Sequence, residues 1–175
     1  MSSGGGSGQF HKEPFQVRRY APGDGAAVAD VFFRSVREGA RADYSPAQVE
    51  AWAPERRAPD WFDDRAADGR VFLVAVNRAH EIVGYADLES DGHIDHLFCR
   101  PDVIGRGVGS GLYDALEEAA RSAAIDRLYV EASVAARRLF AHKGFVVLHR
   151  QDLVVRGVEM HNYAMEKRVG AAATP

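Results

Sequence analysis

The residues best suited to chemistry run from Arg106 to Gly111, where glycine alternates with other residue types in the stretch RGVGSG. The pattern then continues directly into an amphipathic helix. Backbone N–H groups at the start of a helix have no partner inside it, and the helix dipole adds partial positive charge there. Glycine allows a close approach to the backbone, and an arginine adds a forked cation. The segment therefore predicts a site for a phosphate or pyrophosphate group.

Three phosphate-binding patterns can be compared with this loop. A Walker loop requires Lys and then Ser or Thr after its last glycine, whereas Leu-Tyr follows here. A dinucleotide fingerprint requires GxGxxG, and these glycines never leave the two-residue gap, although Glu131 lies about twenty residues further on, where a ribose-binding acid is expected. The third pattern, Arg-x-x-Gly-x-Gly, is matched by Arg106, Gly109 and Gly111. Because a glycine loop also occurs as a plain surface turn, the surrounding elements must decide whether this loop binds a phosphate group.

Candidate bases lie on the two predicted strands that flank this loop and its helix. Asp95, on a strand over residues 93–100, is the first candidate, since a carboxylate can take a proton directly or through water. His96 has a pKa suited to a base, and Glu131, near the end of a strand over 127–132, is the third candidate. Each also has a structural interpretation, as an ion-paired carboxylate or a packed histidine. Side chains alternate along a strand, so one face is expected to carry Asp95, Leu97 and Cys99, and the other Ile94, His96 and Phe98.

Metal and thiol chemistry are less consistent with the pattern. His93, Asp95 and His96 are ligand types, but on a strand His96 points away from the other two, so no metal site is predicted. The single cysteine, Cys99, is interpreted as a small buried residue and not as a nucleophile.

Hydrophobic periodicity indicates which elements position these residues. Strands are predicted over 15–20, 71–76, 81–88, 93–100 and 127–132, with a final hairpin of 145–155 and 158–167. Helices are predicted from an N-cap at Asp24 to about Gly39, over 46–52 behind Ser45, over 60–65, after the glycine loop, and from Ser133 to Lys143. This order predicts an α+β (mixed α/β) fold with one largely antiparallel sheet flanked by helices. The aromatic segment from Tyr44 to Phe62 either lines a pocket or anchors a long connection.

Composition limits the class of protein. The chain has 175 residues, of which 46% are hydrophobic, and a formal net charge of −3, which predicts one domain with a core and argues against a nucleic-acid partner. The domain is expected over 14–168, between a flexible glycine- and serine-rich tail at 1–13 and a second tail at 169–175. The sequence has no apolar run long enough for a bilayer and no signal-peptide core, so no membrane partner and a cytoplasmic location are expected.

A second motif strengthens the interpretation of the loop. Ser133, Ala136, Leu139, Phe140, Gly144 and Phe145 follow the pattern N-x-x-A-x-x-L-Y-x-x-x-G-F. Together with the element order and the loop after the fourth strand, this pattern resembles the GCN5-related N-acetyltransferase (GNAT) family, over Phe15 to Lys167. The stretch YSPAQVEAWAP at 44–54 looks like a bacterial subgroup whose acceptor is undefined. The resemblance implies a three-layer sandwich.

The resemblance also implies a ligand, acetyl-coenzyme A, used as a co-substrate without a metal. Its pyrophosphate is expected on the backbone of Arg106, Gly107, Val108, Gly109, Ser110 and Gly111. Its pantetheine arm is expected to run beside Leu97, Phe98 and Cys99 like an added strand, with the thioester end near Ser133 and Phe140. The acetyl group is expected where this strand and the strand over 127–132 splay apart.

The implied reaction is direct transfer of the acetyl group to a primary amine on a small molecule or peptide. This chain departs from the family pattern at Phe140, where many members carry a tyrosine that protonates the leaving thiolate. Ser133, Tyr163 or a water can take that role, or CoA can leave as the thiolate. Two alternatives stay open at this point: a non-catalytic acyl-CoA-binding or sensing module, motivated by Phe140, and a nucleotide-binding oxidoreductase, motivated by Glu131. A homodimer is also left open.

Overall fold

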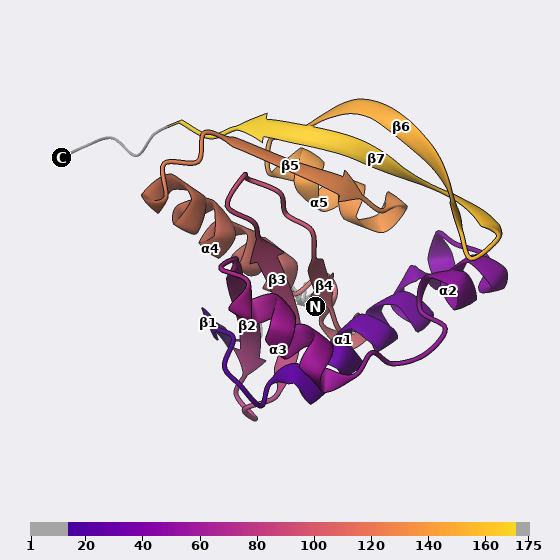
Figure 1. Cartoon of the computed structure of the whole chain (residues 1–175), viewed down its shortest axis with the longest axis horizontal. Helices are drawn as coiled ribbons and strands as arrows, with labels where there is room; N and C mark the ends of the chain where they lie inside the picture. The colour runs from indigo at the N-terminus through magenta and orange to yellow at the C-terminus, as the bar shows by residue number, and fades with distance from the viewer. Residues whose placement is uncertain (1–13, 171–175) are drawn as a thin grey trace, which may run out of the picture.

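The computed structural model describes residues 14–170, and its elements follow the predicted order (Figure 1). The strands are β1 (Phe15–Arg19), β2 (Val71–Asn77), β3 (Ile82–Leu88), β4 (Leu97–Cys99), β5 (Arg127–Ala132), β6 (Val146–Val155) and β7 (Val158–Arg168). The helices are α1 (Gly25–Arg37), α2 (Pro46–Trp52), α3 (Pro59–Ala67), α4 (Val108–Ser122) and α5 (Val134–His142), with 3-10 turns η1 (Gly39–Ala42) and η2 (Pro101–Val103). Within residues 14–170, no helix has the length and apolar character needed to cross a bilayer.

The first sheet is antiparallel, in the order β1-β2-β3-β4, and helices cover both of its faces. Side chains alternate along β2, so Phe72 and Val74 join a core with α1 and α3, whereas Leu73 and Ala75 join a second core with α4. Figure 1 shows α3 and α4 on opposite sides of this sheet. This arrangement confirms the predicted α+β fold with helices on both faces.

The second sheet has the order β5-β7-β6, and it meets the first through one parallel bridge between His93 and Tyr129. The prediction of one sheet with a strand over 93–100 was therefore too simple. The backbone near residue 93 pairs with β5, because Ile94 N–H donates to the Tyr129 carbonyl at 2.9 Å and Tyr129 N–H donates to the Gly92 carbonyl at 3.0 Å. The segment then crosses to the first sheet, where β4 pairs with β3 for only three residues.

This crossing also breaks the predicted alternation of side chains. Ile94 is buried in the core on the α4 side, the same core against which Leu97 and Cys99 pack. It was expected on the opposite face, with His96 and Phe98. The prediction assumed one continuous strand, but the chain changes partner strands between residues 94 and 97.

Helix starts were predicted well where a local motif specifies them. Ser45 forms a full capping box with Gln48 ahead of α2, and Ser133 Oγ accepts the Ala136 N–H at the start of α5. Asp24 occupies the N-cap position of α1 but makes no cap bond; its carboxylate accepts from Arg18 and from Ala21 N–H instead.

The ends of the domain differ slightly from the prediction. Val169, expected to begin a tail, is buried in the core and donates its N–H to the Asp126 carbonyl at 2.8 Å. The predicted tail at 1–13 and residues 171–175 lie outside the described residues.

Candidate active site

Two cavities adjoin beside β4. The first, here called the loop groove, has a volume of about 420 Å³ and runs from β4 to the glycine loop and α5. The second, here called the aromatic cavity, has a volume of about 250 Å³ and extends from β4 to β5 and the β6–β7 hairpin. Five residues line both cavities: Trp52, Leu97, Phe98, Ser133 and Ala136.

The loop groove ends at the start of α4. Gly107 caps this helix with a φ of +89°, in the left-handed region that glycine adopts without strain. The Gly111 N–H donates to the Gly107 carbonyl at 2.9 Å, so the amides that precede it have no helical carbonyl to bind. Gly107, Gly109 and Ser110 line the groove at this point. The groove therefore combines apolar walls with a helix N-terminus suited to an anion.

The other predicted loop residues have different environments. Arg106 is exposed beside the loop, and the Val108 side chain is buried in the core. Leu97, Phe98 and Cys99 line the groove, and burial raises the pKa of the Cys99 thiol to about 12. Cys99 therefore contributes a neutral wall.

Gly111 has a packing reason to be glycine. A Cβ atom there would lie 2.6 Å from Phe15 Cζ, which is too close for a contact between carbon atoms. We expect Gly111→Ala to lower the free energy of unfolding by about 1–3 kcal/mol, the usual cost of overpacking. Urea denaturation would measure the free energy of unfolding of the variant and the wild type. Calorimetric titration should show that both bind a ligand in the groove with the same affinity. Lost affinity at full stability would instead assign Gly111 to the binding surface.

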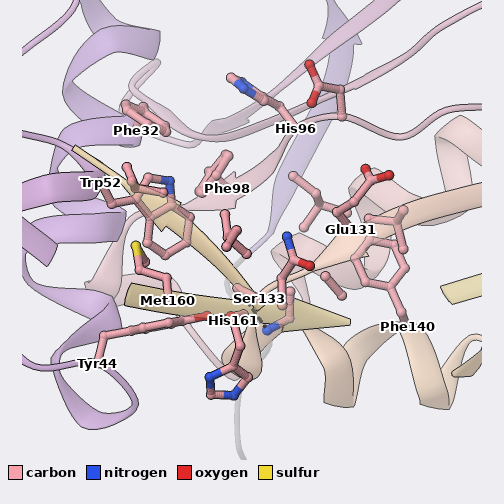
Figure 2. Close-up of a pocket in the computed structure, with 18 of the residues that line it drawn as sticks. Phe32, Tyr44, Trp52, His96, Phe98, Glu131, Ser133, Phe140, Met160 and His161 are labelled. Atoms are coloured by element: carbon pink, nitrogen blue, oxygen red, sulfur yellow. Dashed lines mark hydrogen bonds between the residues drawn. The ribbon is translucent and has the colours of Figure 1, made fainter. Parts of the chain in front are cut away.

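The aromatic cavity is assembled from segments that are far apart in the chain. Figure 2 shows Phe32 and Trp52 on one side of the cavity, with Glu131 and Phe140 on the other. Its apolar lining includes Phe32, Tyr44, Trp52, Phe98 and Met160. Both interpretations of the aromatic segment hold, since Tyr44 lines the cavity and also accepts the Val134 N–H at 3.0 Å. The sequence offered no signal for Phe32, Met160 or His161 as cavity residues.

His96 lies among aromatic rings at the edge of this cavity. It stacks against Phe32 and Trp61, each with its ring centroid 5.8 Å away, and its Nδ1 lies 2.9 Å from Tyr85 Oη. Burial, reinforced by nearby arginines, lowers the pKa of His96 to about 4. The imidazole is therefore neutral at physiological pH and a weak proton acceptor.

Asp95 lines the same cavity but belongs to a buried ionic network. It pairs with Arg65, whose Nε also donates at 2.8 Å to Asp87, and Arg70 reaches Asp87 at 3.3 Å. Burial acts to raise the pKa of Asp95, but the hydrogen bond from Arg65 brings it below its usual range. Asp87 is fully buried, and sequence reasoning did not single it out, because a lone carboxylate at a strand end carries no motif.

Glu131 lines the cavity from β5. Its Oε2 lies 2.6 Å from His93 Nε2, and the His93 ring stacks on Tyr129 at 4.7 Å, beside the bridge that joins the sheets. The described residues contain no group of three or more His, Cys, Asp and Glu side chains arranged to hold a metal ion.

The two candidate acids and Phe140 occupy three different environments. Ser133 lies where the two cavities adjoin, whereas Phe140 is buried against Tyr113 and Phe145 and lines only the aromatic cavity. Tyr163 lines neither cavity; its ring lies 4.4 Å from the Arg137 guanidinium. Only Ser133 thus places a hydroxyl group at the junction.

Comparison with known families adds an independent observation. A family model described as an acetyltransferase (GNAT) domain matches residues 40–167. The chain belongs to the GNAT family. As a GNAT enzyme it is an N-acetyltransferase that uses acetyl-CoA, and this assignment replaces the dinucleotide interpretation of the loop.

Relatives of this GNAT domain support the assignment. The chain is 31% identical over 150 residues to an uncharacterized N-acetyltransferase, YafP, from Escherichia coli K12, covering 86% of this chain and 93% of the relative. A crystal structure of a GCN5-related N-acetyltransferase from Rhodopseudomonas palustris is 36% identical with a TM-score of 0.80, covering 87% of this chain and 94% of that chain. The fold also matches yncA from Salmonella typhimurium, solved with acetyl-CoA, at 20% identity and a TM-score of 0.70, over 93% of this chain and 98% of that one.

Proposed function

We propose that this GNAT enzyme transfers the acetyl group directly from acetyl-CoA in the loop groove to a primary amine in the aromatic cavity. The observation that carries the proposal is the shared wall of the two cavities, made by five residues that include Leu97, Phe98 and Ser133. A thioester that reaches this wall from one side can meet an amine that reaches it from the other. Holding two reactants in contact supplies much of the acceleration in such a reaction.

Two features of the groove support the placement of the donor. The pyrophosphate can accept hydrogen bonds from the amides at the start of α4, with Gly109 beneath it. β4 is the last strand of its sheet, so within residues 14–170 the edge away from β3 pairs with no strand at Leu97–Cys99. The amides of the pantetheine arm can extend the sheet along this edge.

We propose Glu131 as the general base. The ammonium form of an acceptor amine has a pKa of about 10, so a proton must leave before attack. Glu131 lines the cavity, and its side chain is 41% exposed, so the proton that it takes can pass on to solvent. Asp95 is held by Arg65, and the imidazole of His96 already binds Tyr85 through Nδ1. These contacts make Asp95 and His96 weaker candidates.

The chemical step then needs no covalent enzyme intermediate. The amine nitrogen forms a bond to the acetyl carbon, the bond from that carbon to sulfur breaks, and the amine proton passes to Glu131. Ser133 Oγ already accepts the Ala136 N–H, which leaves its own O–H free to donate to the departing sulfur. Phe140 has no hydroxyl and cannot donate a proton to the sulfur. Because a thiol has a pKa of about 8.5, its thiolate is a tolerable leaving group even without a full proton transfer.

Two measurements on the purified protein test this proposal. Calorimetric titration with acetyl-CoA should show binding, and a thiol-release assay across a panel of amines should show turnover with at least one amine. Binding without release from any amine would contradict direct transfer. A failure to bind acetyl-CoA would contradict the placement of the donor in the loop groove.

Replacing the proposed base tests the assignment of Glu131. We expect Glu131→Gln to lower kcat by about 100-fold or more, the usual contribution of a general base, and to leave the Kd for acetyl-CoA unchanged. Glu118→Gln, on the exposed face of α4, is the matched control. Turnover of Glu131→Gln at the wild-type rate would mean that Asp95 or His96 is the general base.

A further inference from the structure

Arg57 is an exposed cation that lines the aromatic cavity. Its guanidinium lies 4.2 Å from the ring centroid of Trp61 and 5.7 Å from that of Phe32. No carboxylate within residues 14–170 is close enough to form an ion pair with it. The neighbouring Arg56, by contrast, pairs with Asp30 at 2.7 Å and does not line this cavity. Arg57 is thus held by stacking, with its hydrogen-bond donors available to a ligand.

His96 adds a second donor on the same side of the cavity. Tyr85 is fully buried, and its pKa is raised well above the usual value by burial, so the phenol keeps its proton and must donate it. The acceptor at hand is His96 Nδ1, at 2.9 Å. A neutral imidazole that accepts at Nδ1 carries its own proton at Nε2, and no other described residue binds that atom. His96 therefore presents an N–H group beside Arg57.

The other side of the cavity presents hydrogen-bond acceptors. Glu131 contributes a carboxylate from β5 (Figure 2). Asn162, on β7, also lines the cavity, and its side-chain oxygen is buried without any hydrogen-bond partner. That oxygen is closed off from solvent, so the acceptor that a ligand can reach on this side is the Glu131 carboxylate. The cavity is therefore polarised, with donors near Phe32 and the Glu131 carboxylate across from them.

We propose that the acetyl acceptor is an amine that also carries a carboxylate, namely a free α-amino acid or a close analogue. Its carboxylate binds Arg57 and His96, and its amino group faces Glu131. The aromatic walls and the volume of about 250 Å³ favour a single apolar or aromatic amino acid over a long peptide. This inference rests on the proposed acetyl transfer to an amine in this cavity.

Matched substrates provide the test. Thiol release would be measured for a panel of amino acids, each beside its carboxamide and its decarboxylated amine; one such set is phenylalanine, phenylalaninamide and phenethylamine. We expect the amino acids to have the highest kcat/KM. Arg57→Gln should lower this value for the amino acid by about 10- to 100-fold, mainly through KM, because a charge-assisted pair is lost. For the carboxamide, the change should stay within about twofold to threefold, since no ion pair is lost there.

Two further variants and one binding measurement separate the outcomes. Arg56→Gln should leave all values nearly unchanged, and Arg57→Lys should recover part of the loss because it keeps the charge. Faster turnover of carboxamides or plain amines than of amino acids would overturn the inference and leave acetyl transfer standing. Equal losses in Arg57→Gln for acid and carboxamide would also overturn it. Calorimetric binding of acetyl-CoA without thiol release from any amine would instead overturn the proposed function, and this inference with it.

Discussion

Gly109→Glu is expected to abolish acetyl-CoA binding, with a loss of affinity of about 100-fold or more. The side chain would enter the loop groove at the start of α4, where we place the pyrophosphate. Like charges brought together in a binding site cost several kcal/mol, and each 1.4 kcal/mol corresponds to about a tenfold change in affinity. Calorimetric titration with acetyl-CoA would measure the effect.

The same substitution should not harm the fold, which makes the result interpretable. A Cβ atom at Gly109 would lie 3.4 Å from the nearest side-chain atom, on Leu139, an ordinary contact distance. Glutamate is a better helix former than glycine, and a negative charge near a helix N-terminus is favourable by about 0.3–1 kcal/mol. The melting temperature should therefore stay the same or rise. Gly109→Gln introduces a side chain of the same size without a charge, so it separates the effect of bulk from that of charge repulsion. Unchanged affinity for acetyl-CoA in Gly109→Glu would refute the placement of the pyrophosphate at the start of α4.

Asp87→Asn is expected to lower the free energy of unfolding by about 3–5 kcal/mol, the range seen when one member of a buried ion pair is removed. Asp87 is fully buried, and its Oδ2 accepts from Arg65 at 2.8 Å and from Arg70 at 3.3 Å. The Oδ1 atom of Asp87 accepts the backbone N–H of His96 at 3.1 Å. A neutral amide would remove the fully buried negative charge between the two guanidinium groups, and Arg65 and Arg70 would keep only their more exposed partners Asp95 and Asp68.

Urea denaturation of the variant and the wild type would measure this loss. Asp152→Asn is the matched control, because Asp152 pairs with Arg150 on the surface and its side chain is 74% exposed. Exposed pairs contribute about 0–1 kcal/mol, so the control should be close to the wild type. A similarly small loss in the free energy of unfolding of Asp87→Asn would mean that water or a movement of Arg65 compensates for the missing negative charge.

The sequence predicts this fold well where the determining contacts are local. The caps at Ser45 and Ser133 need only residues three positions away, and both serines were expected at helix starts; the capping box with Gln48 is seen only in the structure. The position of the glycine loop before a helix is also local, although α4 begins at Val108, inside the stretch expected to be loop, with Gly107 as its N-cap. Alternating and periodic apolar residues likewise placed the strands and helices within a few positions.

Features that depend on distant partners were not predictable in this way. The pairing of His93 depends on Tyr129, a partner that no local pattern of residues 93–100 reveals. The cavity walls combine Tyr44 with His161, whose carbonyl oxygen lies 3.4 Å from the tyrosine hydroxyl across 117 positions of sequence. The role of Asp87, on β3, follows only from the approach of Arg65 from α3 and of Arg70.

Part of the aromatic cavity lies outside the segments that form the loop groove, and this division has an evolutionary consequence. The loop groove is formed largely by the continuous stretch from Leu97 to Ser110, by α5 and by the end of α1, whereas Phe32 and the β6–β7 hairpin line the aromatic cavity and not the loop groove. Substitutions at positions such as Phe32, Met160 or His161 can therefore change which amine is accepted without altering the binding of the acetyl donor. A lineage of such enzymes can explore new acceptors through these segments while the donor half stays constant.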